Sequence, residues 1–166
     1  MRTRLCTAIL LGLVVAPTAL ARNLGDVVQE AGAGWLIGTW QMEDEMGNKT
    51  TVSYRWALDK NLVMLDFRSA RWNSKGMTFC DPAEDKVTYI AVDDRGGHLQ
   101  GTWSLEGGNP LVVYEHTDTE GHKRRVGVLH KRVDDNTFKG EMYEVLDSGQ
   151  LASQPALTVE MKRKSS

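Results

Sequence analysis

The sequence predicts an all-β protein, an antiparallel meander of about ten strands closed into a barrel and preceded by one short helix. Three observations support this prediction. Apolar residues alternate with a period of two along most of the 166-residue chain. Turn residues interrupt the alternation about every 10–12 residues. A helical period of 3.6 occurs once, close to the N-terminal side of the first strand.

The helix is predicted over residues 22–34. Leu24, Val27, Val28 and Ala31 follow the i, i+3, i+4, i+7 spacing of one apolar helix face. Gly32 follows this face and is a typical helix terminator. The helix is therefore expected to pack one side against the strands that follow.

The predicted strands are short, and each is bounded by Gly, Asn or Asp. These residues tolerate the positive φ of tight hairpin turns. The strands are expected at residues 35–45, 50–58, 62–71, 75–80, 86–93, 98–106, 110–117, 123–133, 137–146 and 156–163.

Alternation divides the side chains between two faces, but it does not say which face is interior. Tyr54 and Trp56 share one face of their strand, and Arg55 lies on the other. Residues 62–67, 87–92 and 111–114 are apolar on both faces, so we expect those strands to be central or covered.

Closing the sheet would remove the exposed edges of so many antiparallel strands. A barrel of eight to ten strands has room for side chains or one small ligand. A two-sheet sandwich fits the same strand count, although the short turns favour the meander and hence the barrel.

The N-terminal residues have the pattern of a secretory signal peptide. Arg2 and Arg4 precede an apolar run over residues 6–15, and Ala19-Leu20-Ala21 resembles a cleavage site. The run is too short for a stable membrane span, which needs about 20 residues. We expect cleavage near Ala21, a secreted or periplasmic location, and a single domain over residues 22–166.

Cleavage would change the charge and the cysteine count. The whole chain has 20 basic and 22 acidic residues, so losing Arg2 and Arg4 leaves 18 against 22, a net charge of −4. This balance argues against a nucleic-acid partner. Loss of Cys6 leaves Cys80 alone, so no internal disulfide is expected.

Gly38-Thr39-Trp40 opens the first predicted strand, just after the helix. This G-x-W resembles the hallmark of the calycin group, the lipocalins and fatty-acid-binding-like barrels. The resemblance implies a lipocalin-like barrel in which an arginine of the last strand packs over the tryptophan. Arg163 is in a suitable position, so Gly38, Trp40 and Arg163 are the expected barrel-closure residues.

A longer succession of motifs resembles uncharacterised secreted bacterial lipocalin-like domains of unknown function. The resemblance covers most of residues 35–163 and implies a fold without an assigned activity. Its motifs are Gly38-Thr39-Trp40, Tyr54-Arg55-Trp56, Asp59-Lys60-Asn61, Asp81-Pro82, Arg95-Gly96-Gly97 and Gly101-Thr102-Trp103.

The many aromatic residues predict that the protein binds a small hydrophobic or amphipathic ligand, because ligand cavities combine apolar walls with a few polar groups. Arg55 and Arg68 are candidates to meet an anionic head group. The full set of interior candidates is Trp40, Tyr54, Trp56, Arg55, Arg68, Trp103 and Tyr114.

No residue pattern indicates catalysis, a metal or a cofactor. The chain has no G-x-S-x-G elbow, no paired His spacing and no phosphate-binding loop. His116 and His130 are expected at strand ends or on the outer face, although one of them could point inward and hold haem. An interaction domain with a filled core, acting with an unknown protein partner, is the main alternative to ligand binding; a haem protein or an enzyme is the other.

Overall fold

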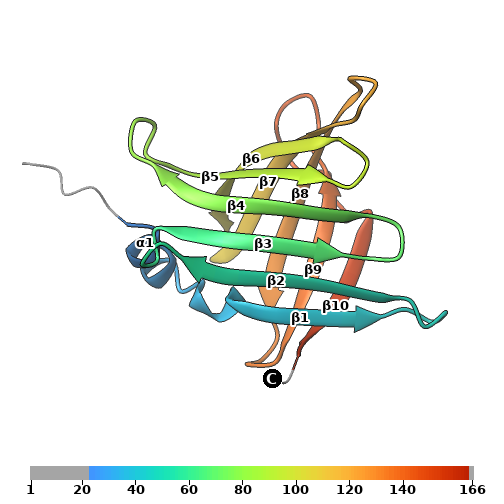
Figure 1. Cartoon of the computed structure of the whole chain (residues 1–166), viewed down its shortest axis with the longest axis horizontal. Helices are drawn as coiled ribbons and strands as arrows, with labels where there is room; N and C mark the ends of the chain where they lie inside the picture. The colour runs from blue at the N-terminus through green and yellow to red at the C-terminus, as the bar shows by residue number, and fades with distance from the viewer. Residues whose placement is uncertain (1–22, 165–166) are drawn as a thin grey trace, which may run out of the picture.

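Ten antiparallel strands run in sequence order around a closed barrel in the computed structural model, which describes residues 23–164 (Figure 1). The predicted fold class, including the short helix before the strands, is confirmed. The predicted signal peptide, residues 1–21, lies outside the described residues. The helices are α1 (Leu24–Glu30) and the 3₁₀ turn η1 (Gly34–Leu36). The strands are β1 (Gly38–Glu43), β2 (Lys49–Ala57), β3 (Leu62–Arg68), β4 (Asn73–Asp81), β5 (Lys86–Asp93), β6 (His98–Glu106), β7 (Asn109–Thr117), β8 (Lys123–Arg132), β9 (Thr137–Glu144) and β10 (Leu157–Arg163).

Closure comes from the pairing of the first strand with the last. Trp40 of β1 lies opposite Arg163 of β10, and Gln41 lies opposite Lys162. Every other strand pairs with its neighbours in sequence. The closed arrangement leaves no unpaired sheet edge, and it is consistent with a lipocalin-like fold.

The first strand is shorter than the predicted range of 35–45. Residues 34–36 form η1, and β1 begins only at Gly38. The difference has a physical cause, because the carbonyls of this segment turn toward side-chain donors instead of joining a sheet ladder. The Trp40 indole N–H donates to the Leu36 carbonyl at 2.8 Å, and Arg163 donates to the carbonyl of Trp35 at 2.7 Å.

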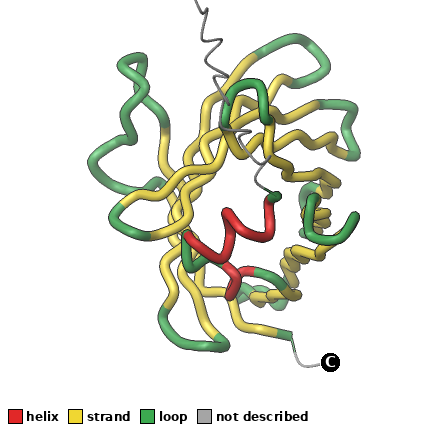
Figure 2. The backbone as a smooth tube through the Cα atoms, turned by 90° about the vertical axis from the view of Figure 1, so that its left-hand side faces the viewer, coloured by secondary structure: helices red, strands yellow, loops and turns green. Residues whose placement is uncertain are grey.

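Helix α1 lies across one end of the barrel (Figure 2). The Asn23 side chain caps it by accepting from the Asp26 N–H at 2.9 Å. Leu24 is 1% exposed and belongs to the barrel core, against which Val28 also packs. The helix is shorter than residues 22–34 because the chain leaves it before Gly32, which has a φ of +62°. No helix in residues 23–164 is both long and apolar enough to span a bilayer.

The closed end is built around Trp40, which is fully buried. The Arg163 guanidinium lies 4.1 Å from the centre of the Trp40 ring and donates to the carbonyls of Trp35, Ile37 and Asp135. Gly38 has a φ of +136°, and a Cβ there would collide with Nη1 of Arg163. Position 38 therefore needs glycine for both its backbone conformation and this close approach.

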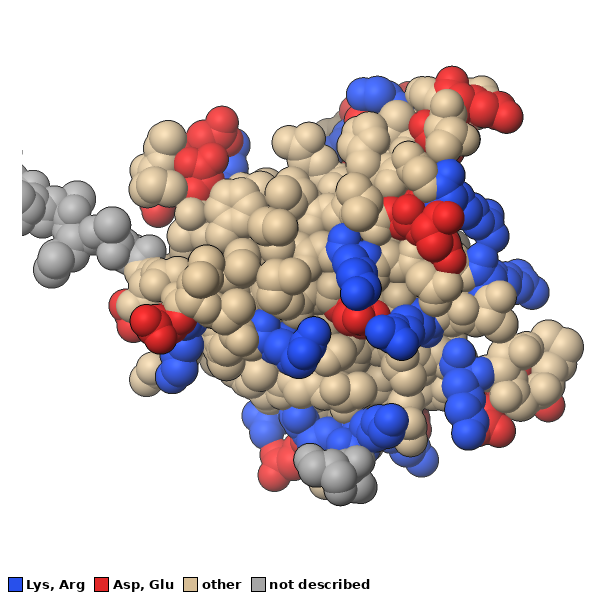
Figure 3. Space-filling view, in the orientation of Figure 1, with Lys and Arg blue, Asp and Glu red and all other residues tan. Residues whose placement is uncertain are grey.

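The strands that are apolar on both faces are covered on one side of the barrel and bare on another. Residues 145–156 fold over the outside of β7 and β8, where Leu151 lies against Gly127, next to the buried Leu111. Met77, Ile90 and Val92 remain exposed on β4 and β5. Figure 3 shows that uncharged side chains cover much of that face. The expectation that these strands are central or covered is confirmed, because each of them lies between two paired neighbours in the barrel. Their outer faces differ: the face is covered at residues 111–114 and exposed at Ile90 and Val92.

We expect Arg163→Ala to lower the free energy of unfolding by about 3–5 kcal/mol, because it removes three charge-assisted hydrogen bonds and the contact with Trp40. Urea unfolding followed by circular dichroism measures this loss. Lys162→Ala is the control, because Lys162 is the exposed neighbour in the same strand; we expect a change within about 0.5 kcal/mol. Equal losses in the two variants would contradict the role assigned to Arg163.

Candidate functional site

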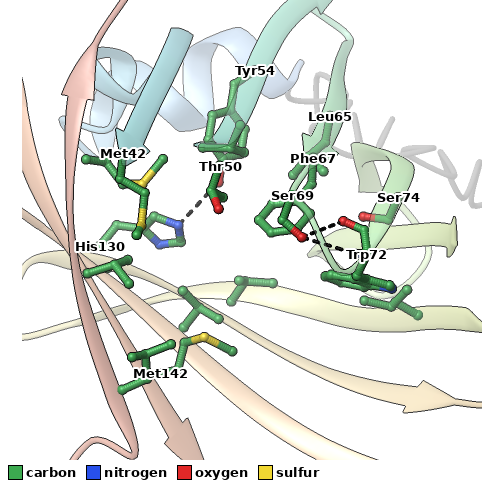
Figure 4. A pocket seen from close by; sticks show the side chains of 18 of the residues that line it. Met42, Thr50, Tyr54, Leu65, Phe67, Ser69, Trp72, Ser74, His130 and Met142 are labelled. Atoms are coloured by element: carbon green, nitrogen blue, oxygen red, sulfur yellow. Dashed lines mark hydrogen bonds between the residues drawn. The ribbon is translucent and has the colours of Figure 1, made fainter. Parts of the chain in front are cut away.

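A cavity of about 390 Å³ occupies the barrel interior on the side away from α1 (Figure 4). It extends from Tyr54 and His130, in the middle of the barrel, to Asn48 and Arg71 at the opposite end, here called the far end. Asn48 and Arg71 are exposed, so the cavity meets solvent there. Its lining residues are Met42, Asp44, Asn48, Thr50, Val52, Tyr54, Leu65, Phe67, Ser69, Ala70, Arg71, Trp72, Ser74, Tyr89, Leu99, Trp103, Val112, Tyr114, Val128, His130, Phe138, Gly140, Met142, Leu157, Val159 and Met161.

The walls are mostly apolar because the strands alternate and their apolar faces point inward. Val52 and Tyr54 of β2 face Phe67 and Leu65 of β3 across the pair, and all four line the cavity. Several wall residues, including Met42 and Val128, remain only partly buried although they lie inside the barrel. The barrel interior is therefore not filled by its own side chains.

Aromatic rings form the floor of the cavity. The rings of Trp103 and His130 are 5.3 Å apart between centroids, and the rings of His130 and Phe138 are 5.6 Å apart. Tyr54 meets Trp103 edge-on at 6.4 Å. Below this layer lies a second apolar cavity of about 220 Å³, bounded by α1 and sharing Tyr54 and Trp103 with the first. The floor is thus a wall between two apolar spaces.

His130 is the one histidine that lines the main cavity, and it is 4% exposed. Its Nδ1 lies 3.2 Å from the Pro110 carbonyl, which can only accept, so Nδ1 carries the proton. Its Nε2, 3.3 Å from the Tyr54 hydroxyl, is then the acceptor. Burial lowers the pKa of His130 to about 4, so the ring is neutral at physiological pH.

Three tyrosine side chains line the same interior as neutral phenols. Tyr89 and Tyr114 flank Gly101 across β5, β6 and β7, with their rings 5.9 Å apart. A Cβ at position 101 would come within 2.7 Å of Cβ of Tyr114, so glycine lets these strands and rings approach closely. Burial raises the pKa of Tyr114 to about 12 and also raises the pKa values of Tyr54 and Tyr89. Within residues 23–164 the hydroxyls of Tyr89 and Tyr114 make no hydrogen bond.

Ser74 is the most informative polar residue of the lining. It is 4% exposed, and its hydroxyl has no hydrogen-bond partner in the described part of the chain. It belongs to the start of β4, beside the 69–72 turn and just inside the far end. Buried polar groups are nearly always paired, so an unpaired hydroxyl on a residue of the cavity lining is a candidate to bond a ligand group.

A buried carboxylate supports the far end of the barrel next to Ser74. Asp93 lies opposite Ser74 in the β4–β5 pair and has a 1% exposed side chain. Burial alone would raise the pKa of Asp93, but hydrogen bonds from the side chains of His116 and Trp72 and from the backbone N–H groups of Gly97 and Arg95 outweigh it and hold the pKa at about 2. The bond to Nε2 of His116 is 2.8 Å long, and the His116 ring also meets Trp72.

The structure brings together some of the residues expected from sequence and separates others. Tyr54, Trp103 and Tyr114 line the main cavity. Trp40 and Trp56 lie in or against the core without lining it.

The two arginine candidates lie elsewhere. Arg55 and Arg68 are exposed on the outer face, where Arg68 pairs with Asp66 at 2.9 Å, and neither lines the cavity. An anionic head group inside the barrel would therefore not meet them. The alternation places Arg55 on the face opposite Tyr54, and Arg68 on the face opposite Phe67. Because Tyr54 and Phe67 point inward, the two arginines point outward.

Sequence reasoning missed Ser74 and Tyr89 and expected His130 at a strand end or on the outer face. That expectation is wrong, because His130 lies inside the barrel. The signal was present in the alternation, since His130 shares a face with Val126 and Val128. It was not decisive, because β8 is also apolar on its other face, where Leu129 is buried and Leu151 lies against Gly127.

The site does not resemble a metal centre. In residues 23–164 no three His, Cys, Asp or Glu side chains are grouped so that they could hold a metal ion. Both nitrogens of His130 are engaged in hydrogen bonds, so ligation of a haem iron would first require breaking the bond to Tyr54.

Comparison of the chain with models of protein families found no match, and comparison with curated proteins found none either. The candidate site therefore rests on the geometry of the barrel itself.

We expect His130 to contribute a loss of stability of about 3 kcal/mol as the pH drops from about 6.5 to about 4. In this window the unfolded chain takes up a proton at position 130, while the buried ring does not. Urea unfolding at a series of pH values measures the slope. The contribution of Asp93 falls in a separate window at lower pH, because its lowered pKa favours the folded state until it is protonated.

His130→Gln should abolish most of this slope, because glutamine does not titrate. The exposed His122 gives the control variant, His122→Gln, which should retain the slope. An unchanged slope in His130→Gln would show that another group is responsible.

Proposed function

We propose that this protein binds a small hydrophobic or amphipathic molecule inside its barrel. The observation that carries the proposal is the cavity of about 390 Å³, with apolar walls and access to solvent at the far end. Cavities of roughly 300–1,000 Å³ with apolar linings and a few polar groups are typical of small-molecule sites. The residues assigned to binding are Tyr54, Ser74, Tyr89, Trp103, Tyr114 and His130.

The lipocalin-like relationship is part of this proposal. Its support is the G-x-W at the start of β1 together with Arg163 stacked over Trp40, which is the arrangement that the resemblance implies. The alternative of a filled core acting through its surface has less support, because the interior contains a cavity of about 390 Å³. Haem binding has less support, since His130 is already hydrogen-bonded on both sides.

We also propose that the chain is exported and functions outside the cytoplasm. The support is the pattern of residues 1–21, with its charged start, short apolar run and Ala19-Leu20-Ala21. An extracytoplasmic barrel without a disulfide would rely on its own core and on the β1–β10 closure.

Binding is tested with Nile red, an uncharged apolar dye whose emission shifts to the blue in an apolar site. We expect saturable binding by the parent protein and at least about tenfold weaker binding by Met142→Trp, which fills the cavity near the far end. Lys139→Trp adds the same side chain on the outer face of β9 and should bind as the parent does. Absence of saturable binding by the parent would refute the proposal.

Export is tested by expressing the full chain in a Gram-negative host and measuring the mass of the protein in each fraction. We expect a periplasmic or secreted product that begins at Arg22. Ala21→Arg should block processing, because the cleavage site requires a small residue at this position. A parent protein recovered only in the cytoplasm, with residues 1–21 still attached, would contradict export.

A further inference from the structure

We propose that the ligand of the barrel is an electrically neutral amphiphile, such as an alcohol, ester or amide, whose polar group hydrogen-bonds to Ser74 while its apolar body lies against the aromatic floor. This inference rests on the proposed binding function and narrows it to a chemical class. It predicts that uncharged ligands bind more tightly than carboxylates or phosphates that carry the same apolar chain.

The first argument is that few charged residues line the cavity. Apart from the tyrosines, the titratable or charged lining residues are Asp44, Arg71 and His130. Asp44 and Arg71 both lie at the rim, and the Arg71 charge helps to lower the pKa of Asp44 after the larger effect of hydrogen bonds from Asn48. These two opposite charges offset each other at the mouth of the cavity.

Deeper in the cavity, no lysine or arginine of residues 23–164 belongs to the lining. Buried His130 is neutral, and the tyrosine phenols remain protonated because burial raises their pKa values. Arg55 and Arg68, the arginines on the neighbouring strands, are exposed on the outer face. An ionised ligand group in this space would be buried without a counter-charge, which is costly.

The second argument is the position of Asp93. Its carboxylate is ionised, since the pKa is about 2, and it lies across the β4–β5 pair from Ser74. His116 bonds to it at 2.8 Å and is itself part-buried. A second negative charge placed at Ser74 would meet this carboxylate, which accepts hydrogen bonds and has no donor of its own to offer an anion. A neutral oxygen or N–H placed there meets no such penalty.

The third argument is the unpaired hydroxyl of Ser74. A serine hydroxyl can donate one hydrogen bond and accept others, so it suits a carbonyl, hydroxyl or amide group equally. Ser74 lies just inside the far end, and from there the apolar walls lead down to the floor (Figure 4). A ligand with its polar group at Ser74 therefore has space for a chain or ring system in the direction of Trp103.

The test compares 1-dodecanol with dodecanoate, which share one apolar chain and differ in the charge of the head group. Isothermal titration at neutral pH, where the carboxylate is ionised, should show at least about tenfold tighter binding of the alcohol. Equal affinities, or tighter binding of dodecanoate, would overturn the inference while leaving the proposed binding function intact. If neither compound nor Nile red binds, the proposed function itself fails.

Ser74→Ala isolates the hydrogen bond. Dodecanol affinity should fall about five- to tenfold. The stability of the unliganded protein should stay the same or rise, because the variant removes an unpaired buried hydroxyl.

Ser148→Ala, in the exposed turn of the 145–156 segment, is the matched control and should leave affinity unchanged. Unchanged dodecanol affinity in Ser74→Ala would overturn the assignment of Ser74. The comparison of alcohol and carboxylate on the parent protein requires no variant, so it remains decisive if Ser74→Ala folds poorly.

Discussion

The guanidinium of Arg163 connects three parts of the chain that are far apart in sequence. It stands on the last strand, stacks on Trp40 of the first, and donates to carbonyls before β1 and in the β8–β9 turn. The β1–β10 seam itself is short, with two residue pairs in register. The side-chain contacts therefore stabilise a junction to which the backbone ladder contributes little, and the shape of the interior depends on that junction.

The strands were readable from sequence because hairpin turns and two-residue alternation are local signals. Gly96, Gly107 and Gly121 occur in turns at a positive φ, as their positions between alternating segments suggest. The ends of the strands were harder to predict from the sequence. The 34–36 segment leaves the sheet to satisfy Trp40 and Arg163, and this demand comes from residues up to 128 positions away.

The site could be predicted only in part from the sequence, for a different reason. Alternation groups Tyr54 with Trp56 and opposes both to Arg55, but the direction of each face depends on how the sheet curves and on what covers it. Once the barrel closes, the direction of each face is fixed for all ten strands: Tyr54, Tyr89 and Tyr114 point inward, and Arg55 and Arg68 point outward. Ser74 carried no signal at all, because a serine near a turn is ordinary until its burial and missing partner are known.

The floor of the cavity has an optical consequence. Of the five tryptophans, Trp103 alone borders both apolar spaces, and its indole N–H is fixed by the hydroxyl of Thr78 at 3.1 Å. Trp40 is sealed in the closed end, and Trp72 borders only the main cavity. A protein reduced to Trp103 as its sole indole would therefore carry a built-in fluorophore at the boundary between the two spaces, one that senses the polarity on either side of the floor from a single fixed position.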